Sequence, residues 1–135
     1  DKKRVGFIGH SYGGRMACIL PAYDKRVKVS IANCYARLLK KSLDIKKNTR
    51  IPMELVVPNI LKFGDFSDFL KLSNNCNVLL SVSKKDKWSQ DAMEIYTKTK
   101  KFFKKKNLEL KRWPAGHSFS KKMRLYSYQY IEKFI

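Results

Sequence analysis

The chain has 135 residues, which fits one small domain, and 44% of them are hydrophobic, which is enough for a core. It contains no apolar run of about 18 residues, so the sequence excludes a membrane-spanning helix, and we expect no membrane partner. The formal net charge of +19, from 30 Lys and Arg against 11 Asp and Glu, excludes a strongly acidic binding protein and raises the question of a nucleic-acid partner.

Three cysteines and two histidines limit the redox and metal chemistry of the chain. Cys18, Cys34 and Cys76 are odd in number and lack the spacing of metal ligands, and so few histidines argue against a zinc site. We therefore expect no metal and no cofactor. Reduced, buried thiols are the expected state, which suits a cytoplasmic location.

The first third of the chain predicts a strand, a helix and a second strand. Residues 5–8 form a near-continuous apolar run, typical of a strand covered on both faces. A helix is predicted over Tyr12–Tyr23, and residues 27–32 alternate as a second strand. The side chains expected on the inner face of the helix are Met16, Ile19 and Leu20.

The rest of the chain continues this alternation. Residues 35–63 have a mixed pattern, which predicts a loop with one or two short helices. Beyond them we predict helices over 66–72, 89–106 and Lys121–Phe134, and strands over Asn77–Ser83 and Leu108–Trp113. Ser89 is the expected cap of the helix over 89–106. The side chains expected to face inward from the last helix are Met123, Tyr130, Ile131 and Phe134.

Alternation of strands and helices defines the predicted fold class, which is α/β. It implies a mostly parallel sheet with helices on both faces. In such sheets the chemistry gathers at the carboxyl ends of the strands, so catalytic residues are expected just after strands.

The residues Gly9-His10-Ser11-Tyr12-Gly13 follow the first strand directly and open the first helix. A serine between a strand and a helix lies on a tight turn, as in a nucleophile elbow, and only small residues fit two positions away on either side. Gly9 and Gly13 occupy those positions. Ser11 is the candidate nucleophile, and the Tyr12 N–H is the candidate oxyanion donor.

A serine nucleophile needs a base, and the chain has two histidines for that role. His10 is adjacent to Ser11, where neighbouring side chains diverge, so it is a poor base for that serine. His117 lies in a loop after the strand Leu108–Trp113, which is a strand-end position. We therefore expect His117 to be the base.

The third group should be a carboxylate that orients the base, placed just after another strand. Asp86 follows Asn77–Ser83 directly and is our candidate, although a turn aspartate is also common in such a context. Lysines surround it, and we expect them to keep Asp86 ionised and to compete with His117 for it. Three other carboxylates remain as alternatives: Asp65, Asp68 and Asp91. Helix capping is another explanation for Asp65 and Asp91.

The chain resembles the α/β-hydrolase superfamily and within it is most similar to the acetyl xylan esterase and dienelactone hydrolase-like branch. The residues that carry the resemblance are Gly9-His10-Ser11-Tyr12-Gly13-Gly14, the segment 57–69, Asp86 and Gly116-His117-Ser118-Phe119. The resemblance implies a serine hydrolase that acts on small carboxylic esters through a Ser11–His117–Asp86 triad and an acyl-enzyme, without a cofactor.

The resemblance spans nearly the whole chain but only the later half of the usual domain. It implies that residues 1–135 are the C-terminal part of one α/β-hydrolase domain, from nucleophile elbow to final helix. An upstream half or a partner chain is then expected to supply the early strands and a second oxyanion N–H. Without such strands the first strand would be an exposed apolar edge.

The sequence does not determine the substrate pocket and leaves two alternative functions open. Leu39, Pro58, Phe63 and Trp88 are guesses for pocket residues. A prolyl-oligopeptidase-like peptidase would use the same triad, and an inactive fragment or a non-catalytic basic binding module is the other alternative. The basic patch for such a module would be residues 98–106. We favour a solvated helix face there, because its phenylalanines continue an apolar stripe at helical spacing, made of Ala92, Ile95, Thr99, Phe102 and Phe103.

Overall fold

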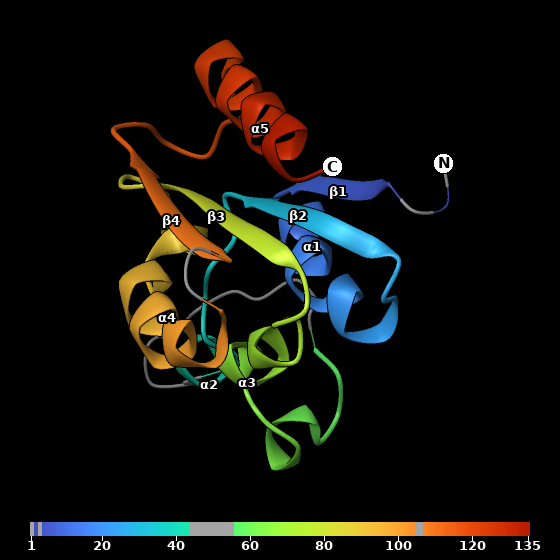
Figure 1. Ribbon diagram of the computed structural model, residues 1–135. Coiled ribbons are helices and arrows are strands. Elements are labelled where there is room, and N and C mark those ends of the chain that lie inside the picture. The colour runs from blue at the N-terminus through green and yellow to red at the C-terminus, as the bar shows by residue number, and fades with distance from the viewer. Residues whose placement is uncertain (1, 3, 44–55, 105–106) are drawn as a thin grey trace.

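The structure is a computed structural model that describes residues 2, 4–43, 56–104 and 107–135 (Figure 1). Within these residues it contains a four-stranded parallel sheet in the order β1-β2-β3-β4. The strands are β1 (Val5–His10), β2 (Val27–Asn33), β3 (Asn77–Ser83) and β4 (Leu108–Trp113). The predicted ranges of β3 and β4 are confirmed, and β1 and β2 extend slightly beyond their predicted ends.

Helices cover both faces of the sheet, which confirms the predicted fold class. The helices α1 (Tyr12–Tyr23), α3 (Phe66–Lys71) and α4 (Ala92–Thr99) lie on one face, and α5 (Lys121–Phe134) lies on the other (Figure 1). The loop between β2 and α3 contains the two short helices expected there, α2 (Leu39–Ser42) and the 3₁₀ turn η3 (Ile60–Lys62). The part of this loop over residues 44–55 lies outside the described residues.

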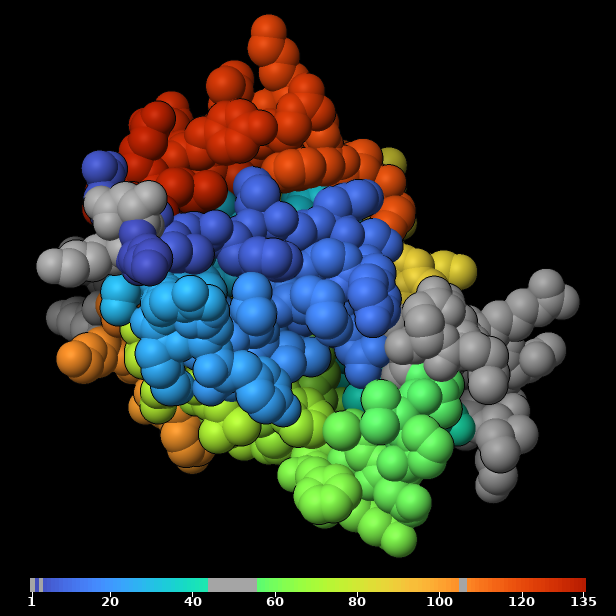
Figure 2. Space-filling view, turned by 90° about the vertical axis from the view of Figure 1, so that its right-hand side faces the viewer, coloured from blue at the N-terminus to red at the C-terminus, as the bar shows by residue number. Residues whose placement is uncertain are grey.

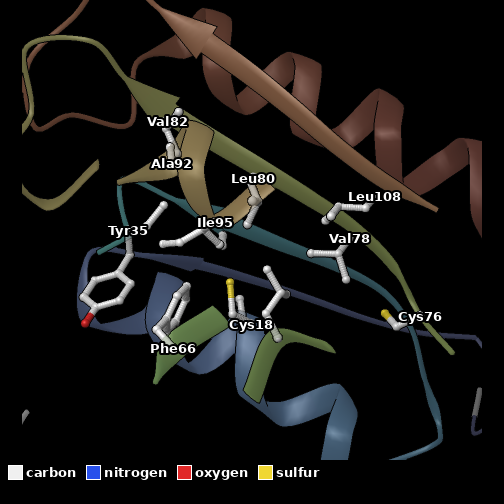
Figure 3. Packing of buried hydrophobic residues seen from close by; sticks show 14 of the residues in the cluster. Cys18, Tyr35, Phe66, Cys76, Val78, Leu80, Val82, Ala92, Ile95 and Leu108 are labelled. Carbon is white, nitrogen blue, oxygen red and sulfur yellow. The ribbon is translucent and has the colours of Figure 1, made fainter. Parts of the chain in front are cut away.

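The central strands β2 and β3 are buried because apolar clusters form on both of their faces. The larger cluster fills the space between the sheet and α1, α3 and α4 (Figure 3). A smaller cluster joins Val29, Ile31 and Leu79 to Tyr130 of α5. This two-sided burial is the physical reason for the continuous apolar runs in these strands.

The inner face of α1 differs from the prediction. Its buried apolar residues are small ones, chiefly Ala17 and Cys18, whereas Met16, Ile19 and Leu20 are only half-buried. Small side chains let α1 approach the sheet closely, so the longer side chains lie at the sides of the helix. Leu20 packs against the main core cluster as expected, whereas the expectation is wrong for Met16 and Ile19, because hydrophobicity does not capture the small size that close packing requires.

The predicted helix over 89–106 is shorter than expected. The chain first forms the 3₁₀ turn η4 (Lys87–Ser89), and α4 is then followed by the 3₁₀ turn η5 (Lys100–Phe102). Ser89 is not a helix cap, because its hydroxyl donates to Asp86 Oδ2 at 2.6 Å. Residues 105–106 lie outside the described residues.

The apolar stripe of this segment is correct apart from Phe102. That ring is 45% exposed, with the amines of Lys71 and Lys101 at 5.0 and 5.3 Å from its centroid. Phe103 is buried instead, because the chain turns at η5 before reaching it.

All three cysteines are buried and unpaired, as expected for reduced thiols. Among the described residues, none of the helices combines the length and apolar character that crossing a membrane requires.

Candidate active site

Ser11 occupies a strained turn between β1 and α1. Its backbone has φ 57° and ψ −117°, in the left-handed half of conformational space that non-glycine residues rarely adopt. The turn is held from both sides, because Ser11 N donates to Asn33 O at 2.9 Å and Ser11 O accepts from Arg15 N at 3.1 Å. Strain of this kind persists where the surrounding structure over-determines it, and it clusters at functional sites.

Gly9 and Gly14 are the glycines on which this turn depends. A Cβ on Gly9 would lie 2.0 Å from Gly13 O, and a Cβ on Gly14 would lie 2.6 Å from Asn33 O. A Cβ on Gly13 would meet nothing within 4 Å. The expectation that only glycine fits therefore holds at position 9. At position 13 the expectation is wrong, and the tight fit occurs at Gly14 instead.

His117 brings its ring to the Ser11 hydroxyl. Its Nε2 lies 2.9 Å from Ser11 Oγ, although 106 residues separate the two in sequence. The loop that carries it follows β4 and is anchored to the neighbouring loop, where Lys85 N donates to Ala115 O at 3.0 Å. The loop then ends at Ser120, whose hydroxyl accepts from Met123 N and caps α5.

Asp86 lies on the far side of the His117 ring. Its Oδ1 is 3.0 Å from His117 Nδ1, and the side chain is fully buried. The same carboxylate accepts hydrogen bonds from Trp88 N and from Ser89 Oγ, which fix its orientation. The neighbouring lysines are exposed and form no ion pair with it in the described part of the chain, so the expected competition with His117 is not found.

Tyr12 supplies the backbone donor expected beside the nucleophile. It is the first residue of α1, so its N–H has no acceptor within the helix, which makes it a candidate donor to an anion. The tyrosine side chain itself is 46% exposed.

A row of buried polar side chains lies behind the candidate triad, and sequence reasoning missed it. Asn33 Nδ2 donates to His10 Nδ1 at 2.7 Å and to Ser118 O at 3.1 Å. Asn33 Oδ1 accepts from Ser81 Oγ, which in turn accepts from Trp113 Nε1. The signal that could have revealed this row is Asn33 itself, an asparagine at the carboxyl end of an otherwise apolar strand. Its hydrogen bond to Ser118 O ties the residue after His117 to the sheet.

His10 belongs to this row and does not face Ser11, in agreement with its expected unsuitability as a base. The centroid of its ring lies 4.8 Å from that of the His117 ring, and the His10 ring stacks on the ring of Phe119. Burial lowers the pKa of His10, and the nearby His117 lowers it further, against a smaller opposing effect of Asp86. A neutral His10 can accept the Asn33 hydrogen bond at Nδ1.

The rival carboxylates hydrogen-bond elsewhere. Asp65 caps α3 and accepts from the backbone N–H groups of Leu39 and Phe66. Asp91 accepts from Leu38 N at 2.9 Å and pairs with a lysine, and Asp68 completes the capping box of α3. The structure brings none of the three to the His117 ring.

In the described part of the chain, one group of side chains could supply metal ligands. Donor atoms of Cys34, Asp86 and His117 lie within 4.8 Å of one another. Burial raises the pKa of the Cys34 thiol, and its Sγ donates to Ser118 O at 3.2 Å. These properties favour the protonated thiol over the thiolate that a metal would need.

The four guessed pocket residues are scattered. Leu39 lines a cavity beside α1, whereas Phe63 is 82% exposed and Pro58 is exposed as well. Trp88 packs against the main core below the Asp86 turn.

Solved structures with the same fold are consistently esterases and related hydrolases. The methylesterase BT1017 matches with a TM-score of 0.74 and 19% identity, over 98% of this chain and 30% of its own. The glucuronoyl esterase from Solibacter usitatus matches with a TM-score of 0.71 and 16% identity, over 98% and 43%. Acetyl xylan esterase 1 from Thermoanaerobacterium sp. gives 0.65 and 18%, over 98% and 46%.

These likenesses define the class: the chain has the α/β-hydrolase fold, which confirms the fold that the sequence resemblance implied. No protein-family model matches the sequence, and neither does any curated protein. The chain spans between 30% and 66% of the length of the solved chains it matches, so it corresponds to part of their fold.

Proposed function

We propose that the chain carries the catalytic residues of a serine-dependent carboxylester hydrolase. The observation that supports this most is the pair of short contacts from one imidazole, 2.9 Å to Ser11 Oγ and 3.0 Å to Asp86 Oδ1. The three residues follow three different strands, β1, β3 and β4, so the fold itself converges them at one edge of the sheet.

In the proposed mechanism His117 Nε2 takes the Ser11 hydroxyl proton as Oγ attacks the ester carbonyl. The tetrahedral intermediate collapses when imidazolium returns that proton to the leaving alcohol, which leaves an acyl-Ser11. Water then enters and gives one proton to His117 as its oxygen attacks the acyl carbonyl. The Ser11 Oγ–acyl bond breaks as imidazolium returns that proton to Oγ, which releases the carboxylic acid and restores the free serine. Asp86 holds the ring and stabilises the imidazolium in both halves.

The developing oxyanion would be bound by the Tyr12 N–H and by a second donor from outside this chain. β1 occupies one edge of the described sheet, so further strands can extend it there. We infer that an upstream half of the domain or a partner chain provides those strands and the second N–H. One donor alone is expected to give slow turnover, because each oxyanion donor contributes about 10²–10³-fold to rate.

Small carboxylic esters are the proposed substrates, since the solved structures with this fold include a methylesterase and an acetyl xylan esterase. A prolyl-oligopeptidase-like peptidase would use the same side chains on an amide. Comparing p-nitrophenyl acetate with a p-nitroanilide of proline tests that choice. Faster turnover of the amide would replace the ester in the proposal.

The test of the nucleophile is labelling with a fluorophosphonate probe followed by peptide mapping. We expect adduct on Ser11, lost in Ser11→Ala and His117→Ala and kept in Thr97→Ala, which changes an exposed hydroxyl on α4. The chain is assayed alone and with upstream sequence restored. No adduct in either form overturns the proposal, and salt-sensitive nucleic-acid binding that survives Ser11→Ala would favour a basic binding module.

A further inference from the structure

Arg15 is a largely buried cation for which the described part of the chain offers no ion pair. It lies one turn into α1, and the residue is only 6% exposed. Its Nε has no hydrogen-bond partner. Within residues 2, 4–43, 56–104 and 107–135, no ion pair to its guanidinium is found. A buried charge normally has a paired anion, because desolvation without one is costly.

The Arg15 side chain lines a cavity of about 220 Å³ beside α1. Apart from Arg15 the wall is almost entirely apolar, with α1 on one side and α3 and η3 on the other. Figure 2 shows the face of the molecule on which α1 and the segment carrying η3 and α3 lie next to each other. Residues that define the wall include Tyr12, Met16, Ile19, Ile60 and Phe69.

Among the residues that the structure describes, the acidic groups next to this wall do not neutralise Arg15. Asp65 uses its two oxygens on the backbone N–H groups at the start of α2 and α3. Asp68 uses its own on Lys71 and on the Asp65 N–H. Tyr35 is not a counter-ion either, because burial raises its pKa to about 12, although the positive charge of Arg15 acts in the opposite direction.

We propose that this cavity binds a small carboxylate with an apolar body, whose carboxylate pairs with the Arg15 guanidinium. A guanidinium presents N–H groups in a planar fork that matches a carboxylate, so one ligand supplies both the missing charge and the missing acceptor. The apolar wall accepts a hydrocarbon body. The volume exceeds the roughly 150 Å³ of an apolar cavity that admits benzene, so a six-carbon acid fits.

The cavity also adjoins the candidate active site through Tyr12. This residue contributes its N–H to the proposed oxyanion site and its side chain to the cavity wall. Resting on the proposed function, this continuity suggests that an ester substrate with a free carboxylate places that group in the cavity. The binding of a carboxylate is a separate claim and does not depend on catalysis.

The binding test uses hexanoate and hexan-1-ol, which differ only in the charged group, added to the full chain carrying Ser11→Ala. Nitrogen-15 NMR follows the Arg15 Nε–Hε signal, and calorimetry at 150 mM salt gives the affinity. We expect hexanoate to shift that signal and to bind at least tenfold more weakly to Arg15→Met. Arg112→Met, which removes an exposed arginine on β4, should bind hexanoate as the parent does.

Two results would overturn the inference. One is an Arg15 signal that hexanoate leaves unchanged or that hexan-1-ol shifts equally. The other is equal hexanoate affinity in the parent and in Arg15→Met, or in Arg15→Gln if the methionine variant does not fold. Since Ser11→Ala carries no nucleophile, failure here would leave fluorophosphonate labelling of the parent chain unaffected, and failed labelling would leave this binding unaffected.

Discussion

Asp86→Asn tests the proposed triad most directly, because the substitution removes one charge and almost no volume. The asparagine keeps an oxygen for Trp88 N, and Ser89 Oγ can accept where it formerly donated. The turn should therefore survive. His117 would lose the negative charge that stabilises its protonated form during Ser11 attack.

The size of the effect follows from the 3.0 Å separation of His117 Nδ1 and Asp86 Oδ1. Two unit charges at that distance interact by about 5 kcal/mol at an effective dielectric of about 20. The His117 side chain is 36% exposed, so solvent screens the pair. With a dielectric of about 40 the interaction falls to about 3 kcal/mol. These limits correspond to a loss of about 10²–10⁴-fold in the rate of Ser11 modification.

The assay is the second-order rate constant of fluorophosphonate labelling, with the midpoint of thermal unfolding measured in parallel. Asp91→Asn and Asp65→Asn are the matched controls, because both remove a hydrogen-bonded carboxylate away from His117, and they should label within about twofold of the parent. A folded Asp86→Asn chain that loses less than about tenfold would refute the reasoning.

Three further predictions concern the surroundings of the triad. Gly9→Ala should lower the free energy of unfolding by about 1–3 kcal/mol and abolish labelling, since its Cβ would lie 2.0 Å from Gly13 O, whereas urea denaturation of Gly13→Ala should show no loss. Asn33→Ala should cost about 1–3 kcal/mol for each buried group left unpaired and slow the labelling, because Ser118 O loses the Asn33 donor and keeps only the weaker Cys34 Sγ donor. Folding lowers the pKa of His10, so the unfolded chain binds a proton first as pH falls, and stability should drop below about pH 6.5. His10→Gln should make that drop shallower in urea titrations at pH 7.5 and 5.5, and an unchanged slope would contradict it.

The parts of the fold that follow from the sequence are those in which hydrophobicity alone decides. Buried parallel strands are continuous apolar runs, so β3 and β4 could be placed to the residue. The candidate site could be located because each of its side chains comes just after such a strand. Ser11 is predicted from its glycine-flanked turn, and Asp86 and His117 from the rule that parallel strands end at the same edge, so none of the three needs side-chain geometry.

The parts that could not be predicted depend on size and on local hydrogen bonds. Ala17 and Cys18 carry less apolar surface than Met16 and Ile19, yet they face the sheet because only small side chains permit close packing there. Serine is a preferred helix-cap residue, but the Ser89 hydroxyl donates to the nearby Asp86 carboxylate instead. A hydrogen bond to a charged acceptor is stronger than one from a neutral backbone N–H at the start of α4.

The row of polar side chains behind the triad shows why the register of the sheet matters for the site. His10 pairs with Asn33 across β1 and β2, and Asn33 pairs with Ser81 across β2 and β3, so the three residues are register partners as well as hydrogen-bond partners. A slip of one residue would turn Asn33 to the opposite face and remove its hydrogen bond to Ser118 O. The interactions that fix the register therefore also hold the loop of His117, and any substitution that loosens β2 should slow Ser11 labelling before it unfolds the chain.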